Sequence, residues 1–411
     1  MSVYGLLGRS LAHSYSPAIH RALGGYDYRL FEVEPEGLAD FLHRADFAGI
    51  NVTIPYKREV IPFCRALSPT AAGIGSVNTL LRRPDGSLFG ENTDAAGFRS
   101  MVERSGVAVA GKKALVLGSG GSSLTVTHVL KELGAGEVVV LSRGGKDNYQ
   151  NLDRQGDAEI LINTTPVGMY PETDAVPVDL AAFPRLKGVL DLIYNPARTR
   201  LLTEAAERGI PQIGGLAMLV GQARAACELF LGSPVDAQRE RAVLRAMRTE
   251  MENVILVGMP GCGKSAVGRL LAQSLGRPFV DADRVLEESA GMSIPDMFAR
   301  EGEGGFRRRE RAVLREVGRK SGLVISTGGG CVTSPENFFA LRQNGVVVFL
   351  ERELDRLARE GRPLSSGDLA GMYERRLPLY RRFADLCIPN DGSLDAVVKK
   401  TLEGVYAFFG D

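Results

Sequence analysis

The sequence lacks an excess of charge of either sign. Its 411 residues include 50 Lys and Arg against 49 Asp and Glu, which gives a formal net charge of +1. A protein that holds nucleic acid usually carries a surplus of basic side chains on one face. The charge balance therefore argues against nucleic acid as a partner.

Long apolar runs are also missing. No run approaches the roughly 18–20 residues of a membrane-spanning helix, and the first ten residues lack the charged-then-apolar layout of a signal peptide. The mean hydropathy of −0.03 is typical of a globular chain. We therefore expect no membrane partner.

Cysteine is scarce and has no regular spacing. The cysteines are Cys64, Cys227, Cys262, Cys331 and Cys387. No C-x-x-C pair occurs, which argues against a disulfide framework and against a zinc site. We expect a reduced, cytoplasmic protein.

One glycine-rich stretch carries a specific chemistry. Residues 258–265, Gly-Met-Pro-Gly-Cys-Gly-Lys-Ser, fit G-x-x-x-x-G-K-[ST] between an apolar run at 254–257 and a helical pattern at 266–272. Such a loop turns backbone N–H groups toward a bound polyphosphate, with Lys264 for the β- and γ-phosphates and Ser265 for Mg²⁺. A glycine-rich turn that binds nothing is the alternative, and the loop alone does not identify a phosphate acceptor.

The chain upstream of this loop is long enough for further domains, since 411 residues predict two or three. Apolar runs alternate with helical patterns such as 17–23, which is α/β patterning. Strands are expected at 4–8, 28–33, 49–54 and 79–81.

Polar residues follow several of these strands. Ser14 and Ser16 precede a helix that starts at Pro17, where they could simply cap it. Lys57 follows the strand at 49–54, and Asp94 ends a later segment. If the fold brings this Lys and this Asp to one cleft wall, they form a proton-transfer pair.

These segments resemble the successive signatures of shikimate dehydrogenases. Residues 14–17 (Ser-Tyr-Ser-Pro), 51–57 (Asn-Val-Thr-Ile-Pro-Tyr-Lys), 76–79 (Ser-Val-Asn-Thr) and 92–94 (Asn-Thr-Asp) occur in the family's order and spacing. The resemblance extends from about residue 3 to about residue 248. It implies that Lys57 and Asp94 serve the proton transfer that accompanies hydride transfer. It also implies that the substrate's hydroxyls and carboxylate are held by Ser14, Ser16, Thr53, Asn78 and Asp94.

A dinucleotide turn is expected after the strand at 113–117. Gly118, Gly120 and Gly121 form it, Ser123 takes the place of the third glycine, and a helix follows from about Leu124 to Leu133. The next strand, 138–141, ends in Ser142 and Arg143, where an NAD site would usually carry an acidic residue. Because a guanidinium suits a 2′-phosphate, we predict NADP rather than NAD.

The segment after Arg143 departs from the family. Relatives usually have Asn-Arg-Thr where this chain has Ser142-Arg143-Gly144, and they place a helix where 144–156 is short, polar and glycine-rich. The strand expected at 158–162 follows directly. We hypothesise that the adenine end of the cofactor is less enclosed here.

Three more segments, 163–169, 191–196 and 214–223, match family signatures. By resemblance, Asn163, Thr164, Leu192 and Gly215 border the cofactor, while Tyr194 and Gln222 reach the substrate. Met218 and Leu219 are expected to be helix core.

A helical pattern at 236–248 closes this first enzyme, and 251–253 leads directly into the strand before the phosphate loop. We expect a substrate-binding domain at 1–100 to which 220–248 returns, an NADP-binding domain at 101–219, and a kinase domain at 249–411.

The phosphate loop is followed by two acidic residues, Asp281 and Asp283. If 279–283 forms a strand, both point to the same side, so that one can help hold Mg²⁺ while the other accepts the proton of an attacking hydroxyl. The alternative is an acidic turn with a helix cap.

The segments 302–310, 326–330 and 362–364, with Arg376 before Leu379 and Tyr380, recur in the order of shikimate kinases. The resemblance covers about 253–411. It implies that shikimate is bound by Asp283, Arg307, Arg376, Gly328, Gly329 and Gly330. Guanidinium forks do suit a carboxylate.

By the same resemblance ATP is held by Gly261, Cys262, Gly263, Lys264, Ser265, Ala266 and the lid residue Arg362. Because no carboxylate after a later apolar strand suits a metal, we expect Mg²⁺ to be held by Ser265 and, through water, by Asp281. Arg308 and Arg309 are expected to be solvated, Glu351 to be structural, and the choice of Arg356 or Arg359 as a helper of Arg362 stays open.

The sequence thus predicts an α/β protein with an α/β substrate domain, a Rossmann-like NADP domain, and a parallel α/β domain like the P-loop nucleoside monophosphate kinases. We predict two consecutive activities, NADPH-dependent reduction of 3-dehydroshikimate and ATP-dependent phosphorylation of shikimate. The alternatives are a first half that also uses quinate, one half that only binds shikimate for regulation, and an ATP-driven switch. A monomer and a homodimer are both open.

Overall fold

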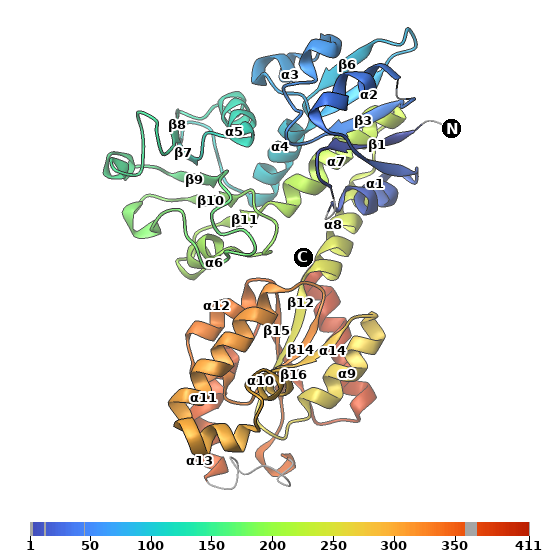
Figure 1. Ribbon diagram of the computed structural model, residues 1–411. Coiled ribbons are helices and arrows are strands. Elements are labelled where there is room, and N and C mark those ends of the chain that lie inside the picture. The colour runs from blue at the N-terminus through green and yellow to red at the C-terminus, as the bar shows by residue number, and fades with distance from the viewer. Residues whose placement is uncertain (1–2, 12–13, 45, 358–367, 411) are drawn as a thin grey trace. The chain divides into compact units, whose positions relative to one another are not determined.

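The computed structural model describes residues 3–11, 14–44, 46–357 and 368–410. It divides into two compact units (Figure 1). Unit 1 comprises Met1–Met169, Asp174–Tyr194 and Leu201–Met247, and unit 2 comprises Tyr170–Thr173, Asn195–Arg200 and Arg248–Asp411. Within the described ranges, none of the helices combines the length and the apolarity that crossing a bilayer requires.

The first sheet of unit 1 is mixed. Its strand order is β2-β1-β3-β5-β6-β4. The strands are β1 (Tyr4–Gly8), β2 (Tyr28–Glu32), β3 (Gly49–Val52), β4 (Cys64–Leu67), β5 (Thr79–Arg82) and β6 (Leu88–Glu91). Strand β5 runs antiparallel to both β3 and β6, and the other pairs are parallel. The strands expected in this part of the chain are present, with ends shifted by up to two residues.

Short helices accompany this sheet: α1 (Ser16–Gly24), η1 (Pro35–Gly37), α2 (Leu38–Arg44), η2 (Ile61–Phe63) and α3 (Pro69–Ile74). Helix α1 begins with Tyr15 at the N-cap position, and no side chain caps it. Neither Ser14 nor Ser16 therefore takes the N-cap position, which was the alternative to a substrate-binding role for these two serines. Ser14 Oγ instead accepts a hydrogen bond from the backbone N–H of Ser16 at 3.2 Å.

The second sheet of unit 1 is fully parallel, with the order β11-β10-β9-β7-β8. Its strands are β7 (Lys113–Leu117), β8 (Glu137–Leu141), β9 (Ile160–Asn163), β10 (Gly188–Asp191) and β11 (Gln212–Gly214). Its helices are α4 (Thr93–Ser105), α5 (Gly121–Glu132), η3 (Leu152–Gln155), η4 (Leu180–Ala182), α6 (Arg200–Glu207) and α7 (Leu216–Leu231). This is the predicted Rossmann-like arrangement.

Strand β7 is buried on both faces, as the middle of such a sheet requires. Ala114 and Val116 pack into one apolar cluster with residues of α4 and α5. Leu115 and Leu117 point the other way into a second cluster with residues of α6. This double burial holds the end of β7, and therefore the turn that follows it, in a fixed position.

Helices α4 and α7 pack closely where two glycines meet. A Cβ on Gly97 would lie 2.6 Å from the Met218 carbonyl oxygen, and a Cβ on Gly221 would lie 3.2 Å from the Gly97 Cα. This approach brings the first turn of α4 near the middle of α7, which is how Asp94 and Gln222 come to share a cavity.

Unit 2 is built on a parallel sheet with the order β13-β14-β12-β15-β16. Its strands are β12 (Asn253–Val257), β13 (Phe279–Asp281), β14 (Val324–Ser326), β15 (Gly345–Glu351) and β16 (Leu386–Pro389). Its helices are α9 (Lys264–Leu275), α10 (Ala282–Ala290), α11 (Ile294–Arg319), η5 (Cys331–Thr333), α12 (Glu336–Arg342), η6 (Leu354–Arg356), α13 (Leu369–Phe383) and α14 (Leu394–Gly410). Strands β12 and β15 are almost wholly buried in its core. This is the predicted P-loop kinase fold.

The junction between the two halves is short, as expected. A single residue, Glu252, separates helix α8 (Ala237–Met251) from β12. The short segment Asn195–Arg200 belongs to unit 2, where the Arg198 guanidinium donates to the carbonyl oxygens of Arg342 and Gly345, both at 2.9 Å.

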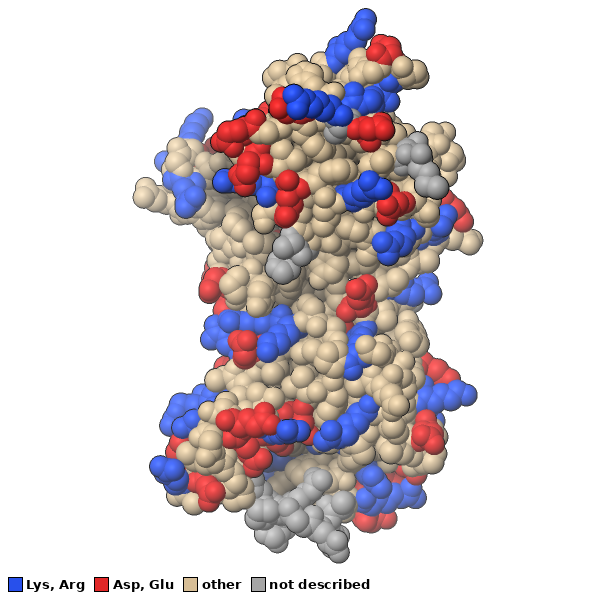
Figure 2. Space-filling model, turned by 45° about the vertical axis from the view of Figure 1, so that its right-hand side comes forward, with Lys and Arg blue, Asp and Glu red and all other residues tan. Residues whose placement is uncertain are grey.

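Charges of both signs are mixed on the surface. Figure 2 shows acidic and basic side chains interspersed among uncharged residues on the face in view. This agrees with the near-zero net charge.

Candidate functional sites

A cavity of about 480 Å³ in unit 1 collects the side chains expected at the dehydrogenase substrate. Its lining includes Ser14, Ser16, Thr53, Lys57, Asn78, Asp94, Tyr194 and Gln222, together with Leu192 and Gly215. These residues come from α1, from the ends of β3 and β10, and from α4 and α7. Because both sheets of unit 1 contribute, the cavity lies where they meet.

Lys57 and Asp94 are in direct contact in this cavity. Lys57 Nζ donates to Asp94 Oδ2 at 2.6 Å across 37 positions of sequence. Their side chains are 28% and 17% exposed, so both groups are partly shielded but reachable from the cavity. Asp94 lies in the first turn of α4, where the helix dipole favours its negative charge. The pair is positioned to move a proton to or from a bound oxygen.

The side chain of Asn78 is oriented by the start of α4. Its Oδ1 accepts hydrogen bonds from the backbone N–H of Thr93 at 2.7 Å and from the Thr93 and Thr79 hydroxyls. These bonds fix which end of the amide is the oxygen. No hydrogen bond engages its Nδ2 within the described part of the chain, so Asn78 can act as a donor toward the cavity.

Two further residues close this cavity. Tyr194 and Tyr15 make an edge-to-face contact with ring centroids 6.2 Å apart, and burial raises the pKa of Tyr194. Gln222 donates through Nε2 to the Leu219 carbonyl at 2.9 Å, which leaves its Oε1 as an acceptor. Met218 and Leu219, which were expected to be helix core, also line the cavity.

The turn after β7 fits a dinucleotide phosphate. Gly118 has a φ of 100°, which favours glycine, and a Cβ there would lie 2.9 Å from Thr165 Cγ2. Helix α5 starts at Gly121 rather than near Leu124, without a side-chain cap or an acidic residue in its first turn. A Cβ on Gly120 or Gly121 would meet nothing within 4 Å. Open space in front of uncapped N–H groups suits a pyrophosphate.

Asn163 and Thr164 lie beside this turn in different ways. Asn163 is fully buried, and its amide bonds to Thr165, Val167 and Asp191. Thr164 donates to the Leu117 carbonyl at 2.6 Å. The structure therefore places Asn163 as a support of the Thr164–Thr165 loop.

The second cavity, of about 840 Å³, lies in unit 2 around the phosphate loop. Its lining includes Gly261, Gly263, Lys264, Ser265, Ala266, Asp281, Asp283, Arg307, Gly328, Gly329, Gly330 and Arg376. The structure thus brings together the expected ATP, metal and acceptor residues, apart from Cys262 and Arg362. Cys262 is a fully buried residue of the phosphate loop.

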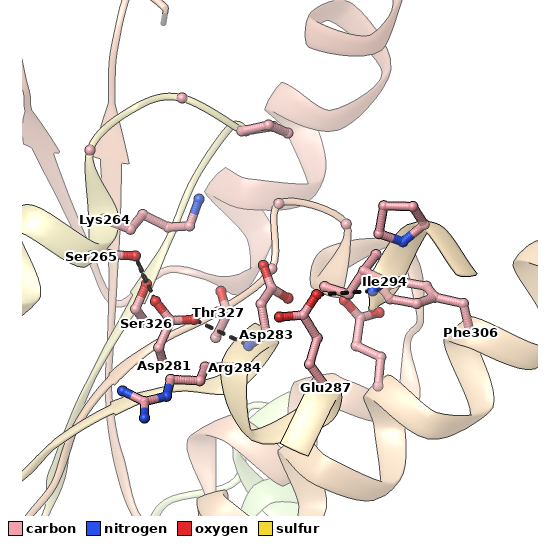
Figure 3. Close-up of a pocket in the computed structure, with 18 of the residues that line it drawn as sticks. Lys264, Ser265, Asp281, Asp283, Arg284, Glu287, Ile294, Phe306, Ser326 and Thr327 are labelled. Atoms are coloured by element: carbon pink, nitrogen blue, oxygen red, sulfur yellow. Dashed lines mark hydrogen bonds between the residues drawn. The ribbon is translucent and has the colours of Figure 1, made fainter. Parts of the chain in front are cut away.

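The phosphate loop ends where α9 begins. Gly263 takes the N-cap position with a φ of 94°, which only glycine adopts readily. Lys264 Nζ donates to the carbonyl oxygens of Gly258 at 2.9 Å and Met259 at 3.1 Å. Ser265 Oγ donates to Asp281 Oδ2 at 2.7 Å (Figure 3). A hydroxyl and a carboxylate in contact are an oxygen ligand pair of the kind that Mg²⁺ prefers.

The expectation that Asp281 and Asp283 share a strand is wrong. Strand β13 ends at Asp281, which caps α10 by accepting a hydrogen bond from the Asp283 N–H at 3.2 Å. The helix-cap alternative is therefore correct for Asp281. Asp283 lies in the first turn of α10, and its carboxylate still faces the same cavity (Figure 3).

The surroundings of Asp283 disfavour the charged form of its side chain. Burial raises its pKa to about 6, with Asp281, Glu310 and Glu287 adding to the rise and Lys264 opposing it. No hydrogen bond reaches its carboxylate from the residues that the structure describes. A carboxylate with such a pKa is suited to act as a base near neutral pH.

Arg307 and Arg376 face the cavity from two helices. Arg307 donates through Nη1 to Glu310 Oε2 at 2.7 Å; burial opposes its charge, but the neighbouring glutamates raise its pKa overall. Arg376 donates to the Gly329 carbonyl at 3.1 Å. A Cβ on Gly330 would lie 2.2 Å from Arg307 Nη2, so the glycine makes room for the guanidinium.

Other expected residues lie away from this cavity or outside the described residues. Arg362 and Arg359 belong to the part that is not described. Arg356 pairs with Glu353, and Glu351 pairs with Arg381. Arg308 is exposed, and Arg309 pairs with Glu301.

Several residues at the two cavities were not identified from the sequence. Asn51 donates through Nδ2 to Thr79 Oγ1 at 3.0 Å and lines the first cavity. Glu310 is 4% exposed, lines the second cavity and orients Arg307. The three-residue spacing of Arg307 and Glu310 on one helix is a signal that could have identified the latter.

Comparison with known proteins identifies a family for each part of the chain. The family model for the shikimate dehydrogenase substrate binding domain matches residues 6–80, and that for shikimate kinase matches residues 260–406. A shikimate dehydrogenase (NADP(+)) from Clostridium perfringens is 36% identical, covering 60% of this chain and 99% of its own length. One from Methanopyrus kandleri is 38% identical over 60% of this chain and 96% of its own length.

Solved structures agree with the fold. A chorismate mutase/shikimate 5-dehydrogenase fusion protein from Clostridium acetobutylicum is 34% identical, with a TM-score of 0.57, covering 60% of this chain and 97% of its own. A shikimate 5-dehydrogenase from Thermus thermophilus, solved in complex with NADP(H) and shikimate, is 35% identical with a TM-score of 0.54, covering 60% of this chain and all of its own. The chain therefore belongs to the shikimate dehydrogenase family through its first part and carries a shikimate kinase domain in its second.

Proposed function

We propose that this chain catalyses two consecutive reactions: reduction of 3-dehydroshikimate to shikimate with NADPH, and phosphorylation of shikimate with ATP. The main support for this proposal is that each cavity brings together, from separate segments of the chain, the groups that its reaction needs. The Lys57–Asp94 contact stands in the first cavity. The second holds Asp283 together with the phosphate loop, Arg307 and Arg376.

In the first cavity, Lys57 gives the proton of its Nζ to the carbonyl oxygen of 3-dehydroshikimate. Asp94, 2.6 Å away, holds the ammonium in place and accepts from a neighbouring substrate hydroxyl. Asn78 Nδ2 donates to a second substrate oxygen, because its Oδ1 is committed to Thr93. Bound NADPH supplies the hydride.

The NADP site is supported by the open turn at Gly118–Gly121 and by Arg143 after β8. The uncapped N–H groups at the start of α5 would hold the pyrophosphate. Thr164, Leu192 and Gly215 would border the nicotinamide side, and Asn163 would support the Thr164–Thr165 loop.

In the second cavity, Asp283 accepts the proton of the attacking shikimate hydroxyl. Arg307 and Arg376 bind the carboxylate, which fixes the acceptor. Ser265 and Asp281 would hold Mg²⁺, and Lys264 would neutralise charge on the phosphates. Bound MgATP supplies the phosphoryl group.

The test is a one-pot reaction of the full chain with 3-dehydroshikimate, NADPH, ATP and Mg²⁺, following NADPH loss and shikimate 3-phosphate. Lys57→Ala should lower the reduction rate by roughly 10²–10⁴-fold and leave phosphorylation of added shikimate unchanged. Asp283→Ala should do the reverse, so each variant is the other's control for folding. ATP hydrolysis without a phosphorylated acid, or unchanged rates in the matching variant, would overturn the assignment.

A parallel assay with quinate and NAD⁺ tests the substrate and cofactor range of the first reaction. We expect shikimate and NADP⁺ to be turned over much faster. Equal turnover of quinate would assign the first cavity a broader substrate class.

A further inference from the structure

A series of hydrogen bonds leads from the interior of unit 1 to the amide of Asn78. The Tyr28 hydroxyl donates to Asn51 Oδ1 at 2.7 Å, and Asn51 Nδ2 donates to Thr79 Oγ1 at 3.0 Å. The Thr79 hydroxyl in turn donates to Asn78 Oδ1 at 3.0 Å. We call these four residues the Tyr28–Asn78 network. Each is at most 5% exposed, so its polar groups depend on one another rather than on water.

The direction of the hydrogen bonds in this network is fixed at Asn51. Asn51 Nδ2 also lies 3.4 Å from the backbone carbonyl oxygen of Asn78, and a carbonyl oxygen can only accept. If the Asn51 amide were reversed, its oxygen would face that carbonyl oxygen. The Asn51 oxygen therefore faces Tyr28. Burial raises the pKa of the Tyr28 hydroxyl, so Tyr28 keeps its proton and donates it to this oxygen.

Asn51 is fully engaged within the network although it lines the first cavity. The two hydrogens of its amide point to Thr79 Oγ1 and to the Asn78 carbonyl, and its oxygen accepts from Tyr28. Because Asn51 supplies the donor to Thr79, the single hydrogen of the Thr79 hydroxyl is free to point to Asn78 Oδ1. Asn51 is thus better suited to orient Asn78 than to hold a substrate.

We propose that Tyr28 and Thr79 are positioning residues for the dehydrogenase reaction, which hold the Asn78 amide with its oxygen inward and its Nδ2 toward the substrate. The inference rests on the proposed function of the first cavity. It adds two residues that do not touch the substrate, since neither belongs to the cavity lining that the structure describes. The Tyr28 ring is itself held by stacking on His20, with ring centroids 4.1 Å apart and an interplanar angle of 9°.

The test is steady-state oxidation of shikimate with NADP⁺ by the full chain. Tyr28→Phe removes only the hydroxyl, which allows the Asn51 amide to reverse and to take the hydrogen of Thr79 away from Asn78. The KM for shikimate should rise roughly three- to tenfold, the effect of about one hydrogen bond. The kcat and the KM for NADP⁺ should stay within about twofold of the parent values, because the Lys57–Asp94 pair is unchanged.

Substitutions at Thr79 test the middle of the network. Thr79→Val removes the hydroxyl and should raise the KM for shikimate at least as much as Tyr28→Phe does, whereas Thr79→Ser keeps the hydroxyl and should retain the parent KM. If Tyr28 acts through Thr79, adding Tyr28→Phe to Thr79→Val should raise the KM no further. Effects that multiply would show that the two residues act independently and would overturn the proposal.

Tyr26→Phe is the matched control. The Tyr26 hydroxyl is hydrogen-bonded to His20 Nδ1 at 2.7 Å and lies outside the network, so its removal should leave the KM for shikimate unchanged. An unchanged KM in Tyr28→Phe, even with a lower Tm, or an equal rise in Tyr26→Phe, would refute the positioning role alone. If the parent chain does not oxidise shikimate with NADP⁺, the proposed function fails and the positioning role fails with it.

Discussion

Replacing Asp283 by Asn should abolish phosphorylation and at the same time stabilise the ligand-free kinase unit. The pKa of Asp283 is raised from 3.8 to about 6, chiefly by burial. One pKa unit corresponds to about 1.4 kcal/mol, so the ionised side chain costs the folded state at most about 3 kcal/mol. Asn has nearly the same shape and carries no charge, and it therefore removes this cost.

The sign of the pH dependence follows from the raised value. The stability contributed by the neutral Asp283 is fully present below about pH 4, its unfolded pKa, and is lost as the pH rises through about 6. The stabilisation of Asp283→Asn over the parent chain should accordingly be largest above pH 7 and vanish near pH 4.

The assay is calorimetric unfolding of the full chain between pH 4 and pH 8. The kinase transition is the one that added ADP shifts upward. For a unit of this size the gain at pH 8 corresponds to several degrees in Tm. Asp281→Ala is the control, because it removes the side chain that caps α10 and accepts from Ser265 Oγ; it should lower stability by about 1 kcal/mol. A pH-independent gain, or a loss in both variants, would refute the electrostatic reasoning.

Two further changes test the cavities. Gly330→Ala places a Cβ 2.2 Å from Arg307 Nη2, so the guanidinium must move. The kinase KM for shikimate should rise at least tenfold, with little change in Tm. An unchanged KM would contradict the placement of Arg307. Asn78→Asp keeps the acceptor that Thr93 uses but removes the Nδ2 donor. The dehydrogenase KM for shikimate should therefore rise about 10–100-fold, which corresponds to a loss of roughly 1.5–3 kcal/mol of binding free energy. The Kd of adenosine 2′,5′-bisphosphate, which carries the adenine and the 2′-phosphate of NADP, should stay the same. If the KM for shikimate and the Kd of the bisphosphate both rise, the substitution has disrupted the fold.

The sequence alone determined those features whose chemistry is encoded in contiguous residues. The phosphate loop is the first example. Gly263 has a positive φ and Lys264 begins helix α9, and the eight consecutive residues of the motif at 258–265 predict both. The strand–turn–helix around Gly118 is another. The order of such local segments was sufficient to identify both families.

The tertiary structure decided whatever depends on residues distant in the chain. The Lys57–Asp94 contact forms only because the segment after β3 and the first turn of α4 line the same cavity of unit 1. The donor orientation of Asn78 comes from Thr93, and the pKa of Asp283 from the acids and burial around it. Asp283 itself was expected on a strand and lies on a helix, because the cap at Asp281 competes successfully with strand extension. Local sequence specifies which groups are available, whereas packing sets their distances, burial and charge environment, and those quantities govern the chemistry.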